Sequence, residues 1–486
     1  MHLATVIPIA AQTANPGASP AANPGLPESL LRRHDVAGPR YTSYPTADRF
    51  VEAFGAAQYR QALVQRAELA PHAAVGASGP LSLYVHIPFC ESVCYYCACN
   101  KVVTRHHERA GEYLQALQRE LELHLAALGR RETLSQLHFG GGSPTFLSDA
   151  ELALLVGSLG AAFHFTPDAE VSIEVDPRTV DAARLAHLAA LGFNRISFGV
   201  QDFDPAVQQA VHRVQPYESV SALMQAARAV GFRSINVDLI YGLPLQTPQS
   251  FARTVAQVAG LRPDRIALYA YAHLPQRFKP QRRIHEHQLP PAADRVGMLS
   301  AALAGFLGHG YTHIGMDHFA LHGDALAVAK RQGRLHRNFQ GYSTQPDCDL
   351  IALGVSAIGK VGACYSQNLK TLGAYYDALK QGQFPVERGL ALSRDDLLRR
   401  AVIMALMCQG RVDFEAIEQA HLVEMRETFA AEFQRLEPLV AQGLVEIEPG
   451  AIQVTPMGWF FVRAVAMVFD RHLNADKVCE RFSRII

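Results

Sequence analysis

The chain is 486 residues long, and its 45 lysines and arginines equal its 45 aspartates and glutamates in number. This balance excludes the global basic field that draws a protein to nucleic acid or to an anionic membrane. The sequence contains no run of about 18 or more apolar residues, which argues against a membrane-spanning helix. A chain of this length predicts one large catalytic domain with smaller modules attached.

The first residues have the composition of a disordered leader, which we assign to residues 1–28. The apolar start, residues 1–11, lacks a basic leading region and is interrupted by Pro8, and a stretch rich in Pro, Gly and Ala follows at 16–25. These are not the features of an export signal. We therefore predict a cytoplasmic protein, and we expect it to be a monomer.

Six strand-like runs follow along the chain. Each run is short, rich in β-branched or aromatic residues, and ends on Gly, Pro or polar residues. The six runs are residues 81–87, 136–140, 170–176, 195–201, 234–241 and 265–273.

Helical patterns separate these strands. Ser148 and Glu151 form a capping box before a predicted helix at 152–163, and Thr247 precedes Pro248 as a cap followed by Pro at the first helical position. Alternating strands and helices predict parallel pairing through right-handed crossovers. Six such units predict an α/β fold with an incomplete (β/α)6 barrel. In full eight-unit barrels the chemistry lies at the carboxyl ends of the strands, and we expect the same here.

Four cysteines gather within ten residues directly after the first strand. Cys90, Cys94 and Cys97 have the spacing Cys-x-x-x-Cys-x-x-Cys, and Cys99 follows them. Three thiolates on one loop can hold three irons of a 4Fe–4S cluster and leave the fourth iron without a protein ligand. An open metal position is where a small molecule can bind and react.

Zinc and disulfides are the two alternative uses of these cysteines. Structural zinc sites usually pair two cysteine or histidine clamps across a longer spacer. No second clamp is present, because the remaining cysteines stand alone at Cys348, Cys364, Cys408 and Cys479. Disulfide frameworks suit small secreted domains. The spacing therefore favours the iron–sulfur cluster over zinc, and zinc over disulfides.

A glycine triplet, 140–142, follows the second strand and precedes Ser143. Glycines permit positive φ and let a ligand lie against bare backbone, although a glycine triplet by itself usually marks only a turn. Polar side chains also end the next three strands, at Glu174, Gln201 and Asp238. A single strand-end carboxylate is usually solvated. Polar groups at the same ends of successive strands favour a polar ligand fixed by charge-assisted hydrogen bonds.

Residues 341–362 are rich in glycine, and we expect them to close over the active site. Beyond them we predict helices at 395–408, 414–419 and 424–442, a strand–turn–strand pattern and a helix at 457–469. This order resembles a winged-helix module without a concentrated basic stretch, so we interpret it as a structural cover over the open face of the barrel. The predicted domains are the leader at 1–28, an N-terminal segment packed on the barrel at 29–80, the catalytic barrel with its cover at 81–375, and a C-terminal helical domain at 376–486.

From about Arg40 onward the chain resembles the oxygen-independent coproporphyrinogen III oxidases, a family within the radical S-adenosylmethionine superfamily. Ser143 is a departure, because the family usually has Thr there; the swap keeps the hydroxyl and removes a methyl group. The resemblance covers over nine-tenths of the chain, and its motifs are residues 40–46, 90–99, 140–144, 172–177, 199–203, 238–244, 315–319 and 336–342.

The resemblance implies a 4Fe–4S cluster bound by Cys90, Cys94 and Cys97, and two molecules of S-adenosylmethionine. The residues implied to contact the first molecule are Tyr84, Gly141, Glu174 and Ile358. The residues implied to contact the second are Tyr96, Gly142, Ser143, Gln201, Arg213, Asp238 and Ala272.

Three of these side chains have a clear physical reason to serve. Arg213 offers a bidentate fork for a carboxylate and Asp238 a counter-charge, and we expect neither of them to contact the cluster. The ring of Tyr96 offers a flat face to a sulfonium or an adenine. Cys99 is not expected to ligate the cluster; we assign it, with Tyr96, a catalytic role near the second cofactor or the substrate.

The implied reaction is oxidative decarboxylation of two propionates of coproporphyrinogen III to vinyl groups, which gives protoporphyrinogen IX. A 5′-deoxyadenosyl radical would abstract hydrogen from the propionate β-carbon, while the protein aims it and excludes water and oxygen. We expect a low-potential electron donor of the flavodoxin or ferredoxin type. The four carboxylates of the substrate need cationic anchors. Our candidates are Arg40, Arg337 and His336, although an isolated surface arginine would contribute little.

Two other functions stay open at this point. A haem chaperone of the same superfamily has a similar cluster loop and barrel, but generally lacks a cysteine at the position of Cys99 and the segment 40–46. A winged-helix regulator that senses redox state would need a basic, exposed C-terminal helix, which the sequence lacks. The resemblance therefore favours the oxidase.

Overall fold

The computed structural model describes residues 27–34, 36–69 and 79–475. The predicted leader lies outside them up to residue 26, and Cys479 lies outside them as well. Glu28, which we placed in the leader, already begins helix α1 (Glu28–His34).

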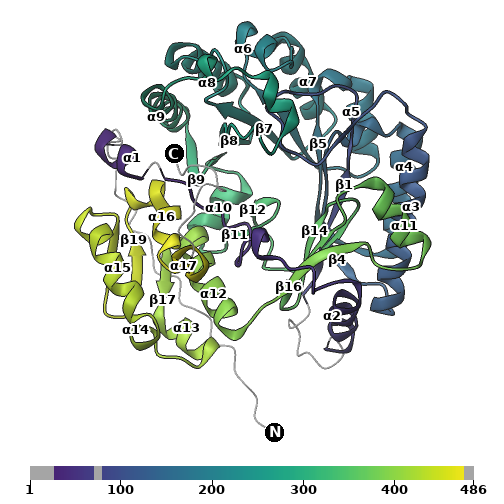
Figure 1. The fold of residues 1–486 in the computed structure, drawn as a ribbon. Coiled ribbons are helices and arrows are strands. Elements are labelled where there is room, and N and C mark those ends of the chain that lie inside the picture. The colour runs from purple at the N-terminus through teal and green to yellow at the C-terminus, as the bar shows by residue number, and fades with distance from the viewer. Residues whose placement is uncertain (1–26, 35, 70–78, 476–486) are drawn as a thin grey trace.

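A curved sheet of twelve strands forms the frame of the described part of the molecule and makes an incomplete barrel (Figure 1). The strands from β13 to β8 run parallel, and those at the two ends of the sheet are antiparallel. In order across the sheet they are β16 (Val386–Ala391), β15 (Cys364–Asn368), β14 (Ile358–Val361), β13 (Leu350–Leu353), β1 (Leu81–Ile87), β4 (Thr133–Gly141), β5 (His164–Val175), β6 (Arg195–Gln201), β7 (Ser234–Tyr241), β8 (Arg265–Ala270), β10 (His318–Leu321) and β9 (Tyr311–Gly315).

Helices cover the outer side of this sheet (Figure 1). The capping box of Ser148 and Glu151 is present at the start of α4, and Thr247 caps α8 ahead of Pro248, as the sequence predicted. The covering helices are α3 (Arg109–Leu128), α4 (Asp149–Ala162), α5 (Ala182–Ala190), α6 (Pro205–Ala210), α7 (Tyr217–Ala229), α8 (Pro248–Leu261), α9 (Ala292–Gly308) and α11 (Leu372–Lys380). Except for α6, whose buried Val207 belongs to a separate small cluster, their apolar faces and the strands form one large core.

The six predicted strands are all present, with three of them correct at both ends: β1, β6 and β7. Strands β4 and β5 begin three and six residues earlier than predicted. Strand β8 ends at Ala270, so the predicted end at residue 273 was wrong. The chain leaves the sheet there because the amide of Leu274 is bonded to the side chain of Gln281, 2.5 Å away, which folds the following loop back on itself.

We expected residues 341–362 to close over the active site, and only two of them line the central cavity. Strand β12 (Gly341–Ser343) pairs with β11 (His336–Asn338), and Tyr342 and Ser343 line the central cavity. Residues 350–353 instead form β13, which pairs in parallel with β1. Their four apolar side chains are all buried, so hydrophobic burial draws this run into the sheet.

The N-terminal segment packs on the barrel. Helix α2 (Ala56–Leu69) lies against α3, and a bridge between Val51 and Gly389 ties the segment to β16. Three short elements complete this part of the fold: β2 (Phe89–Cys90), β3 (Val102–Val103) and α10 (Ala325–Arg331).

The C-terminal region combines helices with a three-stranded sheet, as in a winged helix, and it lies at the open side of the barrel (Figure 1). The Tyr342 hydroxyl donates to the Met407 carbonyl at 2.8 Å, and the Trp459 indole donates to the Ile314 carbonyl at 3.2 Å, so this region is joined to the barrel. Its elements are α12 (Arg394–Gln409), β17 (Arg411–Asp413), α13 (Phe414–His421), α14 (Met425–Thr428), α15 (Ala430–Ala441), β18 (Val445–Ile447), β19 (Ala451–Val454), α16 (Val462–Met467) and α17 (Arg471–Ala475).

Two predicted helices in this region were too long. The helix predicted at 424–442 divides at Phe429, whose fully buried ring packs edge-on against Phe469. The helix predicted at 457–469 begins as a 3-10 turn (Gly458–Phe461) before α16. Gly458 lies directly against the backbone of Leu444, so the chain must turn tightly there.

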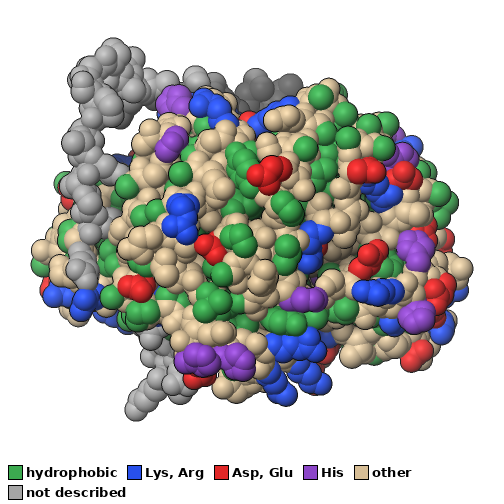
Figure 2. Space-filling view, turned by 90° about the horizontal axis from the view of Figure 1, so that it is seen from above, with side chains coloured by type: hydrophobic (Ala, Val, Ile, Leu, Met, Phe, Trp, Pro, Cys, Tyr) green, Lys and Arg blue, Asp and Glu red, His purple; other side chains and the backbone are tan. Residues whose placement is uncertain are grey.

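None of the helices in the described part of the chain is long and apolar enough to cross a membrane. Acidic and basic side chains are interspersed over the face of the molecule in Figure 2, consistent with the balanced composition.

Candidate active site

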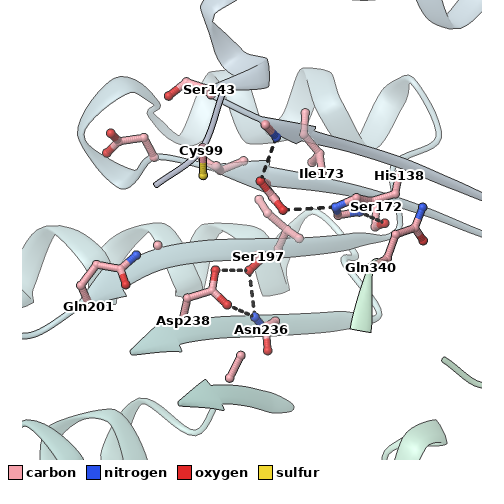
Figure 3. Close-up of a pocket in the computed structure, with 18 of the residues that line it drawn as sticks. Cys99, His138, Ser143, Ser172, Ile173, Ser197, Gln201, Asn236, Asp238 and Gln340 are labelled. Carbon is pink, nitrogen blue, oxygen red and sulfur yellow. Dashed lines mark hydrogen bonds and ion pairs between the residues drawn. The ribbon is translucent and has the colours of Figure 1, made fainter. Parts of the chain in front are cut away.

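A cavity of about 600 Å³ lies inside the barrel, with the cluster loop and the ends of the parallel strands at its mouth (Figure 3). It brings together most of the residues that the sequence singled out. Those that line it are Cys90, Cys94, Tyr96, Cys97, Cys99, Gly141, Gly142, Ser143, Glu174, Gln201, Arg213 and Asp238. Three of the predicted cofactor-binding residues do not line it: Tyr84, Ala272 and Ile358.

The cysteine loop is fixed by its own backbone. The Cys97 amide donates to the Cys94 carbonyl at 3.2 Å, and the Thr104 amide donates to the Cys90 carbonyl at 2.9 Å. Hydroxyl and guanidinium donors reach the sulfurs: Ser143 lies 3.9 Å from Cys90 Sγ, and Arg213 lies 3.3 Å from Cys94 Sγ. Donors of this kind stabilise thiolate sulfur, so the donor set fits a thiolate-bound iron–sulfur cluster.

The three cysteines do not converge on a single point. Among the described residues, no group of three or more His, Cys, Asp or Glu is placed to hold one metal ion. A cubane cluster binds each thiolate through a different iron. Cys90, Cys94 and Cys97 all line the cavity, as ligands to different irons of one cluster would have to.

Cys99 faces the cavity with an exposed side chain. A hydrogen bond from Cys99 lowers the pKa of Cys97 to about 5, and the same contact raises the pKa of Cys99.

Asp176, Arg178 and Arg213 form a charged group beside Cys94. The Asp176 carboxylate is 2.7 Å from Arg178 and 3.1 Å from Arg213, and both guanidinium groups also reach Cys94 Sγ, at 3.5 and 3.3 Å. Burial alone would raise the pKa of Asp176, but the two arginines hold it below its usual value. We expected Arg213 to stand apart from the cluster, but its guanidinium donates to Cys94, one of the cysteines that we assign to the cluster.

The sequence analysis missed Asp176 and Arg178 as members of the site. Asp176 follows Glu174 by two residues, and Arg178 comes two residues later, in a strand-end motif that we had already singled out. The signal was the charge pattern at a strand end. What the sequence could not give is that a turn, Pro177–Thr179, folds Arg178 back onto Asp176.

Glu174 and Asp238 both line the cavity, and Figure 3 shows Asp238 beside Ser197 and Asn236. Glu174 accepts hydrogen bonds from His138 at 3.3 Å and from the Gly141 amide at 3.2 Å. Its pKa is lowered because these bonds outweigh burial. Asp238 accepts from Ser197 at 2.9 Å and Asn236 at 2.8 Å; burial and the charge of Glu174 raise its pKa to about 6.

The glycine triplet is required for this packing. A Cβ at Gly140 would stand 3.0 Å from the Glu174 carboxylate, and Gly141 has φ +114°, which favours glycine. The triplet is thus more than a turn, because it lets backbone approach the carboxylate that the cavity presents.

The three predicted residues outside the cavity lining occupy the layer behind it. The Tyr84 hydroxyl lies 2.9 Å from His86 Nδ1, and its ring stacks on His138, a lining residue. The Ala272 carbonyl accepts from Gln281, which also donates to the Tyr96 carbonyl. Ile358 lies on β14, paired with β15.

The proposed substrate anchors do not line the cavity. Arg40 forms an ion pair with Asp317, and its guanidinium lies 5.0 Å from the ring of Tyr269; Arg337 lies 4.6 Å from the ring of Tyr342. Both tyrosines line the cavity, so these arginines stand one layer behind it.

His336, the third candidate anchor, is also absent from the lining; burial lowers its pKa. The cations that do line the deeper cavity are Arg195 and Arg265, each bonded at 2.9 Å to a carboxylate, Glu170 and Asp324. Each of these arginines is the first residue of a predicted strand, and this position was the feature of the sequence that could have indicated them.

Residues 84–258 match the Radical SAM superfamily, and residues 392–461 match the HemN C-terminal domain. Curated relatives are similar over almost the whole chain. The oxygen-independent coproporphyrinogen III oxidase of Salmonella typhimurium is 48% identical over 94% of this chain and 98% of the relative, and that of Escherichia coli is 47% identical over the same shares. The solved structure of the Escherichia coli coproporphyrinogen III oxidase HemN, described as a radical SAM enzyme, has a TM-score of 0.85, with 47% identity over 92% of this chain and 99% of that one.

A parallel barrel with a three-cysteine loop at the carboxyl ends of its strands defines the class, the radical S-adenosylmethionine proteins. A 4Fe–4S cluster and S-adenosylmethionine are the cofactors of that class, and the donors around Cys90, Cys94 and Cys97 fit the cluster. Within this class, the chain belongs to the family of oxygen-independent coproporphyrinogen III oxidases.

Proposed function

We propose that this protein decarboxylates two propionate side chains of coproporphyrinogen III to vinyl groups without oxygen, giving protoporphyrinogen IX. One observation carries the proposal: a single cavity holds the three-cysteine loop and Cys99, in a chain that is 47–48% identical to oxidases of this name over nearly its full length. The haem chaperone is less well supported, because such proteins generally lack a cysteine at that position. Each vinyl group requires loss of hydrogen, carbon dioxide and one further electron, so an electron acceptor is a reactant.

Together, the cluster and S-adenosylmethionine supply hydrogen abstraction from an unactivated carbon when they are bound. The residues of the chain hold the cofactors, orient the substrate and shield both from water and oxygen. We assign the cluster to Cys90, Cys94 and Cys97. We assign S-adenosylmethionine at the open iron to Tyr84, Gly141, Glu174 and Ile358.

A second S-adenosylmethionine is a further part of the proposal. Glu174 and Asp238 give the wall two carboxyl groups, which suit an amino group or ribose hydroxyls. We assign the second molecule to Tyr96, Gly142, Ser143, Gln201, Arg213, Asp238 and Ala272. The exposed thiol of Cys99 and the ring of Tyr96 then stand beside the reacting side chain.

We also propose that a low-potential flavodoxin or ferredoxin reduces the cluster, and that the protein is a cytoplasmic monomer that does not bind nucleic acid. The division at residues 28, 80 and 375 stays a proposal. The last strand of the large sheet, β16, ends at Ala391, and the HemN C-terminal match begins at residue 392.

The test is anaerobic turnover of the reconstituted protein with coproporphyrinogen III, S-adenosylmethionine, dithionite and an electron acceptor. We expect a product that has lost two carboxyl groups and gained two vinyl groups. A protein that binds haem tightly and yields no vinyl product would be the chaperone instead.

The second cofactor site is tested by Asp238→Ala. Removing a charged partner from a desolvated site costs on the order of 2–5 kcal/mol. The variant should keep the visible spectrum of the cluster, bind fewer S-adenosylmethionine molecules per protein and decarboxylate poorly. Wild-type stoichiometry and turnover would remove the second site from the proposal.

A further inference from the structure

Four basic side chains gather within seven residues of the loop that follows β8. They are Arg277, Lys279, Arg282 and Arg283, and all four are exposed. Glu286 is the single acidic residue of the sequence between 271 and 289, while the whole chain has no net charge. We call these four side chains the basic patch.

The basic patch stands on a segment that is packed against the cluster loop. Gln281, in the middle of the patch, is buried and donates to the Tyr96 carbonyl at 2.9 Å. Ile284 belongs to a small buried apolar cluster against which the rings of Tyr95 and Tyr96 pack. Tyr95 and Tyr96 are the two residues between Cys94 and Cys97, so the patch and two cluster ligands are held by the same packing.

Arg283 makes the most direct connection. Its guanidinium donates to the Tyr95 hydroxyl at 3.2 Å and lies 5.1 Å from the centre of the Tyr95 ring. The Tyr95 ring stacks on His212, and Tyr95 directly follows Cys94 in the sequence. An electron carrier seated on the patch would therefore stand over the outer side of the cluster loop.

Three of the four patch residues, Lys279, Arg282 and Arg283, keep their positive charge without a carboxylate partner within the described part of the chain. Arg282 donates to the Pro275 carbonyl and Arg283 to a tyrosine, and no carboxylate forms an ion pair with either of them or with Lys279 there. None of the patch residues lines the cavity. A partner on the patch would thus leave the cavity free for the substrate.

We propose that the basic patch is the docking surface of the electron carrier, a small acidic protein that gives one electron to the cluster. The inference rests on the proposed function, which requires such a reductant. In the step, the reduced carrier loses one electron and the cluster gains it, with no bond made or broken. Exposed charges of this kind act mainly on the rate of encounter and on its dependence on salt.

The test is the charge reversal Lys279→Glu with Arg282→Glu in the holoenzyme, with reduced flavodoxin as the probe. The matched control is Arg60→Glu with Arg233→Glu: both residues are exposed, and the change in net charge is identical. The patch variant should raise the KM for flavodoxin about tenfold or more at low salt, and slow the bleaching of the cluster by flavodoxin without substrate. The control should stay within about twofold of the wild type in both measurements.

Turnover driven by dithionite tests the decarboxylation activity separately from the docking of flavodoxin. The patch variant should retain wild-type turnover with dithionite, because neither residue touches the cavity. An unchanged KM for flavodoxin, or an equal rise in patch and control variants, would overturn the docking surface. Absence of vinyl product from the wild type with dithionite would overturn the proposed function instead.

A second readout is independent of turnover. Carbodiimide should couple Lys279 to a carboxylate of flavodoxin, and Lys279→Arg should lose this cross-link while keeping the rate of reduction. Cross-links that form only at other lysines would contradict the assignment.

Discussion

At the carboxyl ends of the strands, the Asp176 carboxylate lies between two guanidinium groups, whereas on the outer side of the barrel the Glu120 carboxylate lies among neutral donors. Glu120, on α3, accepts hydrogen bonds from the Tyr375 hydroxyl at 2.6 Å, the Gly354 amide at 2.7 Å and the Asn368 amide at 2.7 Å. Asp176 has Arg178 and Arg213.

The difference separates a functional arrangement from a structural one. Two arginines beside one carboxylate leave one positive charge in excess. Both guanidinium groups contact Cys94 Sγ, so this charge lies next to that sulfur. An iron–sulfur cluster with thiolate ligands is anionic, so we expect this excess charge to stabilise a cluster held by Cys94 and to raise its reduction potential. The donors of Glu120 instead join α3 to the chain around Gly354 and to α11, without a cation. The first group serves the cavity and the second fixes the fold.

The largest effect is expected from replacing Cys94, the cysteine that Arg178 and Arg213 both contact. In Cys94→Ala the cluster should not assemble, because thiolate is the ligand that the iron requires. Iron content, visible absorption and cleavage of S-adenosylmethionine should all be lost. The matched control is Cys364→Ala, a cysteine on β15 outside the cavity lining, which should keep its iron. A full 4Fe complement in Cys94→Ala would show that the ligand assignment is wrong.

Arg213→Ala should have the next largest effect. Arg213 is buried and bonded to Asp176, to Cys94 Sγ and to the Gly199 carbonyl at 2.6 Å. Loss of a buried charged partner costs on the order of 2–5 kcal/mol, or about 30-fold or more in turnover. Because the cysteines remain, iron should still be incorporated, with a lowered reduction potential. Wild-type potential and turnover per iron would contradict the role of the excess charge.

Arg178→Ala should have a smaller effect, because Asp176 keeps Arg213 as a partner. The Arg178 side chain is 20% exposed, against 7% for Arg213, so water screens part of its charge. We expect a loss of about 1 kcal/mol, close to fivefold in turnover. Measured under the same conditions, an effect of Arg178→Ala larger than that of Arg213→Ala would reverse our ranking of the two arginines.

The parts of the fold that the sequence predicted correctly are those where pattern alone decides structure. Strands β1, β6 and β7 largely alternate apolar with polar or small side chains, and the caps of α4 and α8 are local hydrogen bonds. The cysteine loop could also be recognised from local sequence, because its spacing lies within ten residues. Where tertiary packing decides, the predictions failed: the break at Phe429 depends on burial against Phe469.

The same limit applies to the site. The strand ends of a parallel sheet share one edge, so Glu174, Gln201 and Asp238 could be placed together from their positions in the predicted strands. The contact between Arg213 and Cys94 spans 119 residues of sequence, and no local pattern predicts it. The anchors Arg40 and Arg337 were chosen for their charge, and the aromatic layer that separates them from the cavity is a property of the packing.

The Glu120 carboxylate, on the outer side of the barrel, should have the smallest effect on turnover. Its expected effect is on how the stability of the protein depends on pH. Burial raises the pKa of Glu120 from its ordinary value of 4.5 to about 7, although its three donors oppose the shift. Between these two values the folded protein holds a proton that the unfolded chain has released. The free energy of unfolding must therefore fall as pH rises from about 4.5 to about 7, by on the order of 3 kcal/mol from this group.

Glu120→Gln isolates this contribution, because the amide does not titrate. Burial lowers the pKa of His124, on the same helix, to about 4; that group costs stability as pH falls, so the slope for the wild type alone would mix two opposite effects. The difference in melting temperature between wild type and Glu120→Gln should shift against the wild type as pH rises from 5 to 7.5, while turnover per iron stays equal. A difference that is constant with pH would mean that Glu120 is ionised throughout, and that three neutral donors stabilise its charge as well as the two arginines stabilise that of Asp176.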